Sequence, residues 1–169
     1  MLEFEKIYKI FDGRIPCKQG CSTCCQRAGD IILFPGESKI LIKKIPRVKK
    51  YIYTKNVNKQ IIELIKQPCP FLKKGRCSIE KNRPLDCRFY PFDYCLFNNE
   101  LIVITSKSCD ALKDISENQN KKIQKALLGI LHKLPKKWLE SAVLFGPCGN
   151  CDKKTDCRLA LMQGYNDKD

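Results

Sequence analysis

The sequence predicts an α+β fold: a small single domain with short strands and hairpins, one long helix in the C-terminal half, and cysteine loops pinned by metal. Three observations favour this class. The apolar runs, such as 31–34 and 101–104, are only strand-sized, and turn residues separate them. One segment, from about 117 to 133, keeps the period of an amphipathic helix over several turns. The length of 169 residues suits one domain with a small appended module.

The first half of the chain alternates short elements with breaks. In order, the pattern predicts a helix over 2–11, a cysteine loop over 17–25, a strand over 31–34 and a helix over 37–45. Pro46 ends the last of these, because proline cannot continue a helix. The segment 47–67 is ambiguous. A strand is indicated near 51–53, but periodicity does not decide between strand and helix over 59–66.

The second half is predicted to hold two hairpins and the main helices. In order, these are a hairpin over 71–79, a short helix over 84–88, a hairpin over 94–104, and helices over 117–133, 136–144 and 156–162. Ser116 is the expected N-cap of the long helix. Its buried stripe is Ile123, Leu127, Ile130, Leu131 and Leu134. We therefore expect a metal-binding core over 1–114 and a helical extension over 115–169, with a C-terminal cysteine loop, packed on that core.

Cysteine is the residue type that most constrains function, because the chain has 12 of them. The N-terminus lacks the basic start and the apolar run of a signal peptide, and no apolar stretch approaches the length of a membrane span. We therefore expect a cytoplasmic protein with no membrane partner, in a compartment where thiols stay reduced. Under those conditions many cysteines indicate metal ligands rather than disulfides.

The cysteines fall into groups whose spacing is typical of metal sites. The candidate ligands are Cys17, Cys21, Cys24 and Cys25; Cys69, Cys77 and Cys87; Cys109; and Cys148, Cys151 and Cys157. The first and last groups each contain two cysteines separated by two residues, a tight turn that aims both sulfurs at one metal. One predicted site joins the first group to Cys87, and a second joins Cys109 to the last group. Cys95 lies beyond the second group and is not among the candidate ligands. Some of the twelve cysteines are expected to be buried free thiols instead.

The predicted donor set is all sulfur, or sulfur with an oxygen ligand, because His132 is the only histidine and lies within the predicted long helix. All-thiolate sites suit both iron–sulfur clusters and zinc. Three close cysteines with a distant fourth favour a 4Fe-4S cluster, and zinc is the alternative. The spacing of Cys17, Cys21 and Cys24 also matches the radical S-adenosylmethionine signature. The chain is short for the barrel of those enzymes and lacks their repeated strand–helix alternation.

Two motifs, in this order, resemble those of the CxxCxxCC family, also called YkgJ-like. The first is Cys17-Lys18-Gln19-Gly20-Cys21-Ser22-Thr23-Cys24-Cys25, and the second runs from Cys69-Pro70-Phe71-Leu72 through Gly75-Arg76-Cys77 to Arg83-Pro84-Leu85-Asp86-Cys87-Arg88. The resemblance covers about 15–110 and implies a zinc- or iron-chelating domain. A flagellin lysine N-methylase carries a related motif, so protein-lysine methylation is one context that the resemblance suggests.

The residues around Cys87 also have expected roles as the surroundings of a metal site. Arg83 and Arg88 are expected to donate hydrogen bonds to sulfur or to nearby carbonyls. A run of aromatic residues is expected to shield the site from water, although core packing is an equal use for most of them. These are Phe89, Tyr90, Phe92, Tyr94 and Phe97.

Positive charge is concentrated in one segment of the chain. The formal net charge is +14, and residues 39–83 hold 14 Lys and Arg against Glu63 and Glu80, which gives 14 − 2 = +12. Such a segment attracts polyanions, and Tyr51 and Tyr53 beside it are candidates for stacking on bases. A nucleic acid is therefore a candidate partner, and a solvated lysine-rich face is the simpler interpretation.

Three functions compete on this evidence. The first is an iron–sulfur protein with a redox or accessory role and an unidentified redox or other protein partner. The second is a zinc-stabilised module that binds nucleic acid or an acidic partner. The third is a component of a protein-lysine methylation or other modifying system. No paired carboxylates, serine–histidine pair or phosphate loop predicts independent catalysis, so the sequence leaves open whether the chain is an enzyme.

Overall fold

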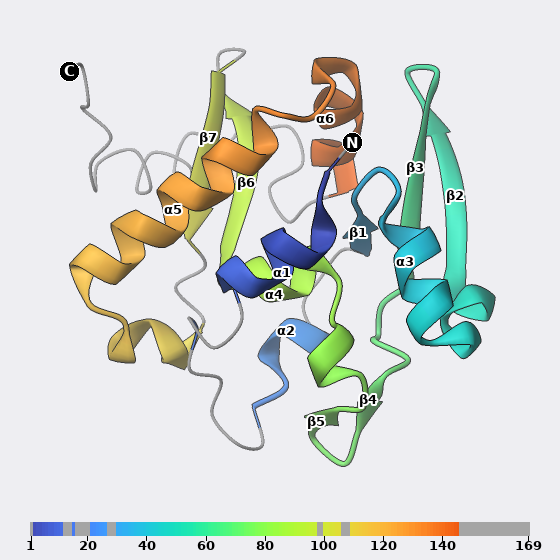
Figure 1. Ribbon diagram of the computed structural model, residues 1–169, viewed down its shortest axis with the longest axis horizontal. Coiled ribbons are helices and arrows are strands. Elements are labelled where there is room, and N and C mark those ends of the chain that lie inside the picture. The colour runs from blue at the N-terminus through green and yellow to red at the C-terminus, as the bar shows by residue number, and fades with distance from the viewer. Residues whose placement is uncertain are drawn as a thin grey trace.

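The computed structural model describes residues 2–11, 15, 21–26, 30–97, 100–105 and 109–145, and it confirms a small α+β arrangement (Figure 1). The helices are α1 (Phe4–Phe11), α2 (Thr23–Gln26), α3 (Glu37–Lys44), α4 (Leu85–Phe89), α5 (Glu117–Leu131) and α6 (Lys136–Ala142). The strands are β1 (Ile31–Leu33), β2 (Ile52–Val57), β3 (Gln60–Ile65), β4 (Leu72–Lys73), β5 (Arg76–Cys77), β6 (Phe92–Phe97) and β7 (Glu100–Thr105). Short 3-10 turns are η1 (Pro46–Tyr51), η2 (Glu80–Asn82), η3 (Asp110–Asp114) and η4 (Val143–Phe145).

Three small antiparallel sheets form the β part of the fold. The largest has the order β1-β3-β2, and the hairpins β4–β5 and β6–β7 make the other two. Strand β3 settles the ambiguous segment, since Ile65 pairs with Ile31 on one side and with Ile52 on the other. Periodicity alone did not separate strand from helix here. The two flanking strands supply the backbone partners that make a central strand.

Both tight hairpins of the first half close on residues with positive φ. Asn58 and Lys59 connect β2 to β3 with φ values of 51° and 62°. Lys74 and Gly75 connect β4 to β5 with φ values of 49° and 72°. Two consecutive residues in this region give the primed turn whose twist matches that of paired strands. The β4–β5 turn confirms the hairpin predicted around 73–76.

Alternation along β1 places two hydrophobic clusters on opposite sides of the largest sheet. Ile32, with Ile62 and Leu64 of β3, belongs to the main core, whereas Ile31 and Leu33 belong to a second cluster. Successive side chains of a strand point to opposite faces, so one short strand serves both clusters. The second cluster contains two of the candidate ligand cysteines, Cys25 and Cys69.

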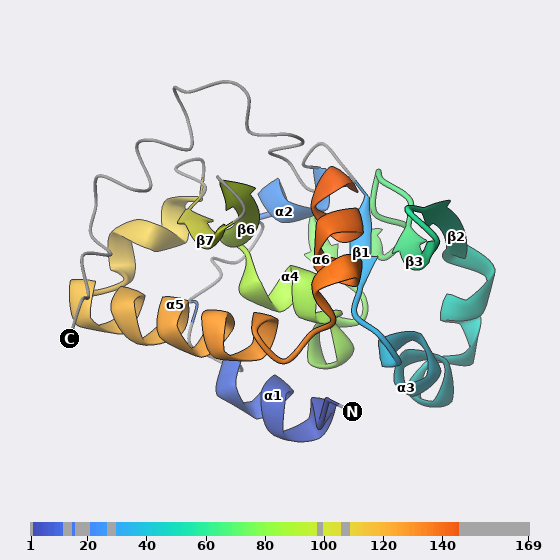
Figure 2. The same cartoon turned by 90° about the horizontal axis from the view of Figure 1, so that it is seen from above.

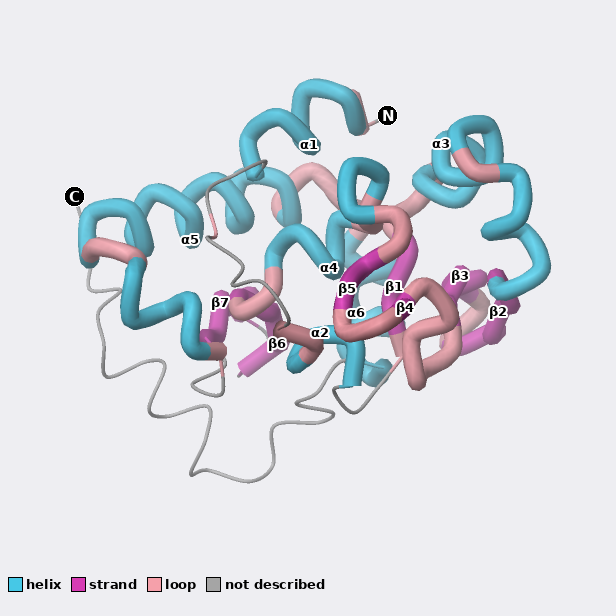
Figure 3. The backbone as a smooth tube through the Cα atoms, turned by 90° about the horizontal axis from the view of Figure 1, so that it is seen from below, coloured by secondary structure: helices cyan, strands magenta, loops and turns pink. Residues whose placement is uncertain are grey.

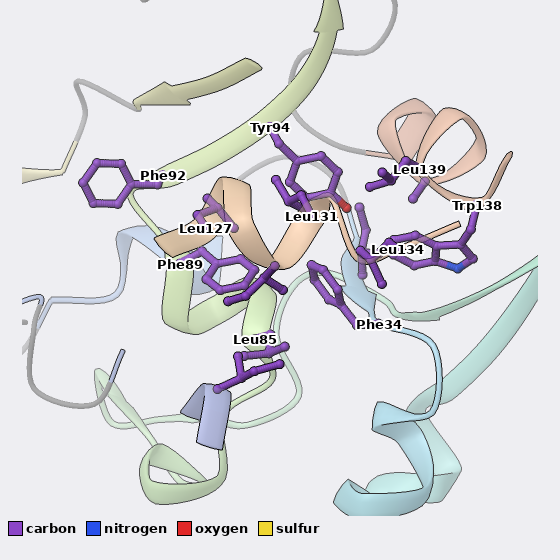
Figure 4. Packing of buried hydrophobic residues seen from close by; sticks show 14 of the residues in the cluster. Phe34, Leu85, Phe89, Phe92, Tyr94, Leu127, Leu131, Leu134, Trp138 and Leu139 are labelled. Atoms are coloured by element: carbon purple, nitrogen blue, oxygen red, sulfur yellow. The ribbon is translucent and has the colours of Figure 1, made fainter. Parts of the chain in front are cut away.

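The main core joins the two halves of the chain. The stripe predicted for α5 is buried at all five positions, and the Ser116 hydroxyl accepts a 3.3 Å hydrogen bond from the Gln119 backbone N–H as a helix cap. Figure 2 shows α1, α3 and α5 along one side of the molecule, with α4 in the middle. Figure 4 shows Leu127 beside Phe89, Leu131 beside Tyr94, and Trp138 beside Phe34. Residues 117–143 thus pack into the same core as α1, α4 and β6.

Two sequence-based expectations need comment. The loop predicted over 17–25 is partly wrong, because α2 covers Thr23–Gln26 and carries Cys24 and Cys25 on a helical turn. The Gln26 side-chain amide donates a 2.8 Å hydrogen bond to the Ser22 hydroxyl across that turn. The helix predicted over 156–162 lies outside the described residues. Among the helices that are described, none combines the length and the apolar character needed to cross a membrane.

Candidate metal centre

Seven cysteines from three distant segments line two adjoining cavities. The larger cavity, of about 290 Å³, is lined by Cys21, Cys24, Cys25, Cys69, Cys77 and Cys87. The smaller cavity is lined by Cys21, Cys24, Cys87 and Cys109, with the apolar residues Phe11, Ile15 and Ala111. Figure 3 shows α2, α4 and the β4–β5 hairpin gathered at this place. None of the cysteines that the structure describes is in a disulfide, which leaves thiol sulfur as the donor type around these cavities.

Backbone and side-chain hydrogen bonds fix the first motif against the second. The Cys69 N–H donates to the Cys25 carbonyl oxygen at 3.2 Å, and the Gln67 side-chain amide donates to the Cys24 carbonyl oxygen at 3.5 Å. Asp30 adds a bridge, since its carboxylate accepts the Gln67 backbone N–H at 3.2 Å and the Tyr53 hydroxyl. The approach of the cysteines therefore follows from the fold of the chain itself.

Several of these sulfurs receive backbone N–H groups from residues that follow them. Cys69 is hydrogen-bonded by Phe71 and Leu72, and Cys109 by Ala111 and Leu112. Cys77 receives the same kind of bond from Ile79. Such bonds favour the thiolate over the thiol, so in Cys77 and Cys109 they oppose the burial that raises the pKa. The thiolate is the form that ligates a metal.

Burial and neighbouring thiols also change the pKa values of these cysteines, and they raise some and lower others. The hydrogen bond from Cys25 lowers the pKa of Cys69 below its usual range. Hydrogen bonds to Cys24 and then to Cys69 raise the pKa of Cys25, so Cys25 keeps its proton in this pair. Desolvation is the main cause that raises the pKa of Cys77 and of Cys109. A bound cation would lower all of these pKa values, because it favours the thiolate.

Helix α4, which carries Cys87, is held by two buried carboxylates. Glu37 has no exposed surface, and its Oε1 accepts the Leu85 N–H at 2.7 Å and the Tyr8 hydroxyl at 2.9 Å. Its Oε2 accepts the Phe34 N–H at 3.0 Å. Asp86 Oδ2 accepts the Ile32 N–H at 3.2 Å. Glu37 has no recognisable motif around it, and sequence reasoning missed it.

The two arginines of the second motif have different roles. Arg88 is buried and donates to the carbonyl oxygens of Arg83 and Lys81, both at 2.8 Å, which confirms the predicted bonds to carbonyls. Its guanidinium also lies 4.4 Å from the centre of the Tyr8 ring. Arg83 lines both cavities, and its buried Nε has no hydrogen-bond partner among the described residues. The charge of Arg83 also lowers the pKa of Cys77, so the arginine lies near that sulfur.

These residues fit a metal or a cluster by chemistry and by space. Thiolate donors suit zinc and iron–sulfur clusters. The Nε–H of Arg83, which has no partner among the described residues, can donate a hydrogen bond to a sulfur or another anion in the cavity. Within the described ranges, no three Cys, His, Asp or Glu side chains are already arranged around a single ion. The sulfurs instead surround a cavity that has room for a group of several atoms.

The structure brings all seven of the predicted site residues that it describes to the two cavities. Cys95 is buried in β6 and lines neither cavity. Cys109 lies with Cys21, Cys24 and Cys87, while the partners predicted for it, Cys148, Cys151 and Cys157, lie outside the described residues, as does Cys17. His132 is exposed at the end of α5.

The predicted aromatic shield needs correction. Of the described members of that run, Tyr90 lines the smaller cavity, whereas Phe89, Phe92 and Tyr94 pack in the main core. The aromatic side chains that do face the cysteines include Phe11 and Phe71, which come from other parts of the sequence. Side-chain direction, rather than nearness in sequence to Cys87, decides which ring faces the metal site.

Comparison with known proteins gives one match. The family model named CxxCxxCC and described as "putative zinc- or iron-chelating domain" matches residues 16–110, which include every cysteine that lines the two cavities. No curated protein and no solved structure matches the chain.

Proposed function

Since the chain belongs to the CxxCxxCC family of zinc- or iron-chelating domains, we propose that its clustered cysteines hold an iron–sulfur cluster, of the 4Fe-4S type, in a redox or accessory role. The observation that carries this proposal is the set of seven cysteines on two adjoining cavities. The larger cavity has room for a group of several atoms, which suits a cubane better than a single zinc ion. When bound, such a cluster supplies one-electron chemistry.

The proposed ligands follow from which cavities the cysteines share. Cys21, Cys24 and Cys87 line both cavities, and we assign them the central positions. Cys109 reaches the group from the smaller cavity, and Cys69 and Cys77 reach it from the larger one. Four thiolates complete a cubane, so the remaining cysteines are left for a second metal or for hydrogen bonding to the first.

The residues around the cysteines support this role by three separate effects. Backbone N–H groups aimed at Cys69, Cys77 and Cys109 stabilise negative sulfur. The Arg83 guanidinium adds positive charge beside a group that four thiolates make anionic. Apolar walls, including Phe11 and Phe71, keep water from the sulfurs, which affects the reduction potential.

Metal and sulfide analysis of protein purified without oxygen tests this function. We expect iron and acid-labile sulfide in equal amounts, with a visible absorption that reductant bleaches. Cys87→Ser should remove most of the iron and sulfide. Cys95→Ser is the matched control and should retain both, because Cys95 lines neither cavity. Zinc without sulfide would contradict the cluster and leave a structural metal site, the alternative occupant of the same thiolates.

A further inference from the structure

A strip of exposed positive charge covers the outer side of η1 and of the β4–β5 hairpin. The basic strip consists of Arg47, Lys49, Lys50, Lys73, Lys74 and Arg76, all of them exposed. Acidic residues are scarce around it, since residues 39–83 contain only Glu63 and Glu80. Glu63 is half-buried and accepts a 2.7 Å hydrogen bond from the Ser38 hydroxyl. Glu80 is exposed and lines the larger cavity with Arg76, so these two acids offset only a small part of the positive charge of residues 39–83.

The segments that carry the basic strip pack into the same hydrophobic cluster as two of the cysteines. The ring of Tyr51, at the end of η1, meets the ring of Phe71 edge-on with centroids 5.3 Å apart. Val48 and Phe71 are both buried in the second cluster, together with Cys25 and Cys69. The two halves of the strip are thus fixed to each other through their buried side chains.

One end of the basic strip reaches the cysteine cavity. Gly75 and Arg76, in the turn and second strand of the hairpin, belong to the lining of the larger cavity. Arg76 is also exposed to solvent. A ligand lying along the strip would therefore cross the mouth of the cavity.

The chemistry of the strip argues against two kinds of partner. A protein interface is anchored by apolar or aromatic side chains at its centre, but the exposed large hydrophobic residues of the described chain are Ile61 and Leu144, outside the strip. Single-stranded nucleic acid needs exposed rings for stacking. The ring of Tyr51 packs against Phe71, and the Lys50 Nζ lies 4.8 Å from its centre. The Tyr53 hydroxyl donates a hydrogen bond to Asp30, and Tyr53 packs against the main core.

We propose that the basic strip binds the phosphate backbone of a nucleic-acid duplex and holds it across the mouth of the cysteine cavity. Phosphate contacts require cations and no exposed rings, which matches this surface. Base contacts are not part of this mode, so binding is independent of sequence. Binding falls steeply with salt, with a log–log slope of about −0.9 for each phosphate contacted. The binding does not require a particular metal in the cavity, so it can be tested separately from the cluster.

Two triple variants with the same change in net charge test the strip. The strip variant is Arg47→Gln, Lys49→Gln and Lys73→Gln. The control variant is Lys122→Gln, Lys125→Gln and Lys133→Gln, which removes three exposed cations on α5 and the turn after it. All six positions are exposed, so folding should be unaffected, and far-UV circular dichroism and metal content check this. The full-length protein, purified without oxygen, is titrated into a fluorescent DNA duplex between about 50 and 200 mM salt.

We expect the strip variant to bind at least about tenfold more weakly, with a salt slope reduced by about 2 to 3. The control variant should keep nearly the wild-type affinity and slope. Equal weakening by both variants, or no duplex binding by the wild type at the lowest salt, would overturn the proposal. So would competition by polyglutamate as strong as that by unlabelled duplex at equal charge, which would make the partner an acidic polypeptide.

Discussion

The backbone N–H of Cys69 lies 3.2 Å from the carbonyl oxygen of Cys25 and donates a hydrogen bond to it. This bond connects α2 to the loop before β4 and brings the two cysteine motifs together. The thiol of Cys25 also hydrogen-bonds to Cys69 and lowers the pKa of that residue. Backbone and side chain thus act on the same pair, and the two motifs form one structural unit.

Asp30 is the residue whose loss should separate the two motifs. We expect Asp30→Ala to lower the free energy of unfolding by about 1–3 kcal/mol, because the Gln67 N–H and the Tyr53 hydroxyl both lose their acceptor. Metal content should fall as well, since Gln67 precedes Cys69 closely. Urea unfolding and metal analysis measure the two effects. Glu100→Ala, at an exposed position, is the control and should change neither.

Cys109 should be required for full metal loading. It lines the smaller cavity with Cys21, Cys24 and Cys87, and two backbone N–H groups stabilise its thiolate. We expect Cys109→Ala to reduce the metal and sulfide bound per chain, as measured by elemental and sulfide analysis. An unchanged metal count in Cys109→Ala would remove this residue from the ligand set.

The parts of the fold that sequence predicts best are those set by local patterns. The stripe from Ile123 to Leu134 repeats over several turns, and Ser116 marks the start of the helix, so both were predicted correctly. The secondary structure of short segments was harder to predict from the sequence. Residues 60–65 became a strand because β1 and β2 lie on either side, which no local pattern reveals.

The candidate site shows the same contrast. Cysteine spacing identified the residues that gather at the cavities, because metal-binding turns leave a pattern in the sequence. The residues that hold the cysteine-bearing segments in place leave no such pattern in the sequence. Glu37 begins a helix, where an exposed acid is ordinary, and only its contacts with Tyr8 and Leu85 reveal that it is buried. The choice between Phe71 and Phe92 as a wall of the site likewise depends on side-chain direction in the folded chain.

The two arginines of the second motif should give opposite results when replaced. Arg88→Gln removes two hydrogen bonds to carbonyl oxygens inside the protein, so we expect a loss of about 2–4 kcal/mol in the free energy of unfolding. Arg83→Gln should cost little stability, since the buried Nε of Arg83 has no partner among the described residues. It should instead slow alkylation of Cys77 in the metal-free protein, because the lost charge lowered the pKa of that thiol. It should also lower the reduction potential of a bound cluster.

Helix α5 should unfold together with the rest of the described chain. Leu127 has no exposed surface and packs in the core that contains Phe34 and Phe89, so Leu127→Ala should cost about 2–5 kcal/mol. Trp138 is the only tryptophan and reports on α6, whereas far-UV circular dichroism reports on all helices. Both probes should shift together in urea, as a single cooperative unit requires. A tryptophan transition that shifts without an equal shift of the far-UV transition would instead divide the chain near residue 115. Leu144→Ala, at a partly exposed position, is the matched control.

Buried Glu37 should make stability fall as the pH rises towards neutrality. Desolvation raises the pKa of this carboxyl from 4.5 to about 7, despite the hydrogen bonds from Phe34, Leu85 and Tyr8. The folded chain therefore holds a proton that the unfolded chain releases. The stabilising contribution is complete below about pH 4.5 and is lost as the pH rises through about 7.

Glu37→Gln should remove this pH dependence, because the amide is neutral at every pH. The difference in free energy of unfolding between wild type and Glu37→Gln should change by about 3 kcal/mol from pH 4.5 to above 7, which follows from a shift of 7 − 4.5 = 2.5 units. Tyr8→Phe removes a hydrogen bond that lowers the pKa of Glu37, so we expect that pKa to rise and the loss of stability to extend to a higher pH range. Urea unfolding at closely spaced pH values measures both effects, with exposed Glu117→Gln as the control. A pH profile of Glu37→Gln parallel to that of the wild type would show that the pKa of Glu37 is the same in the folded and unfolded chains, because its hydrogen bonds offset its burial.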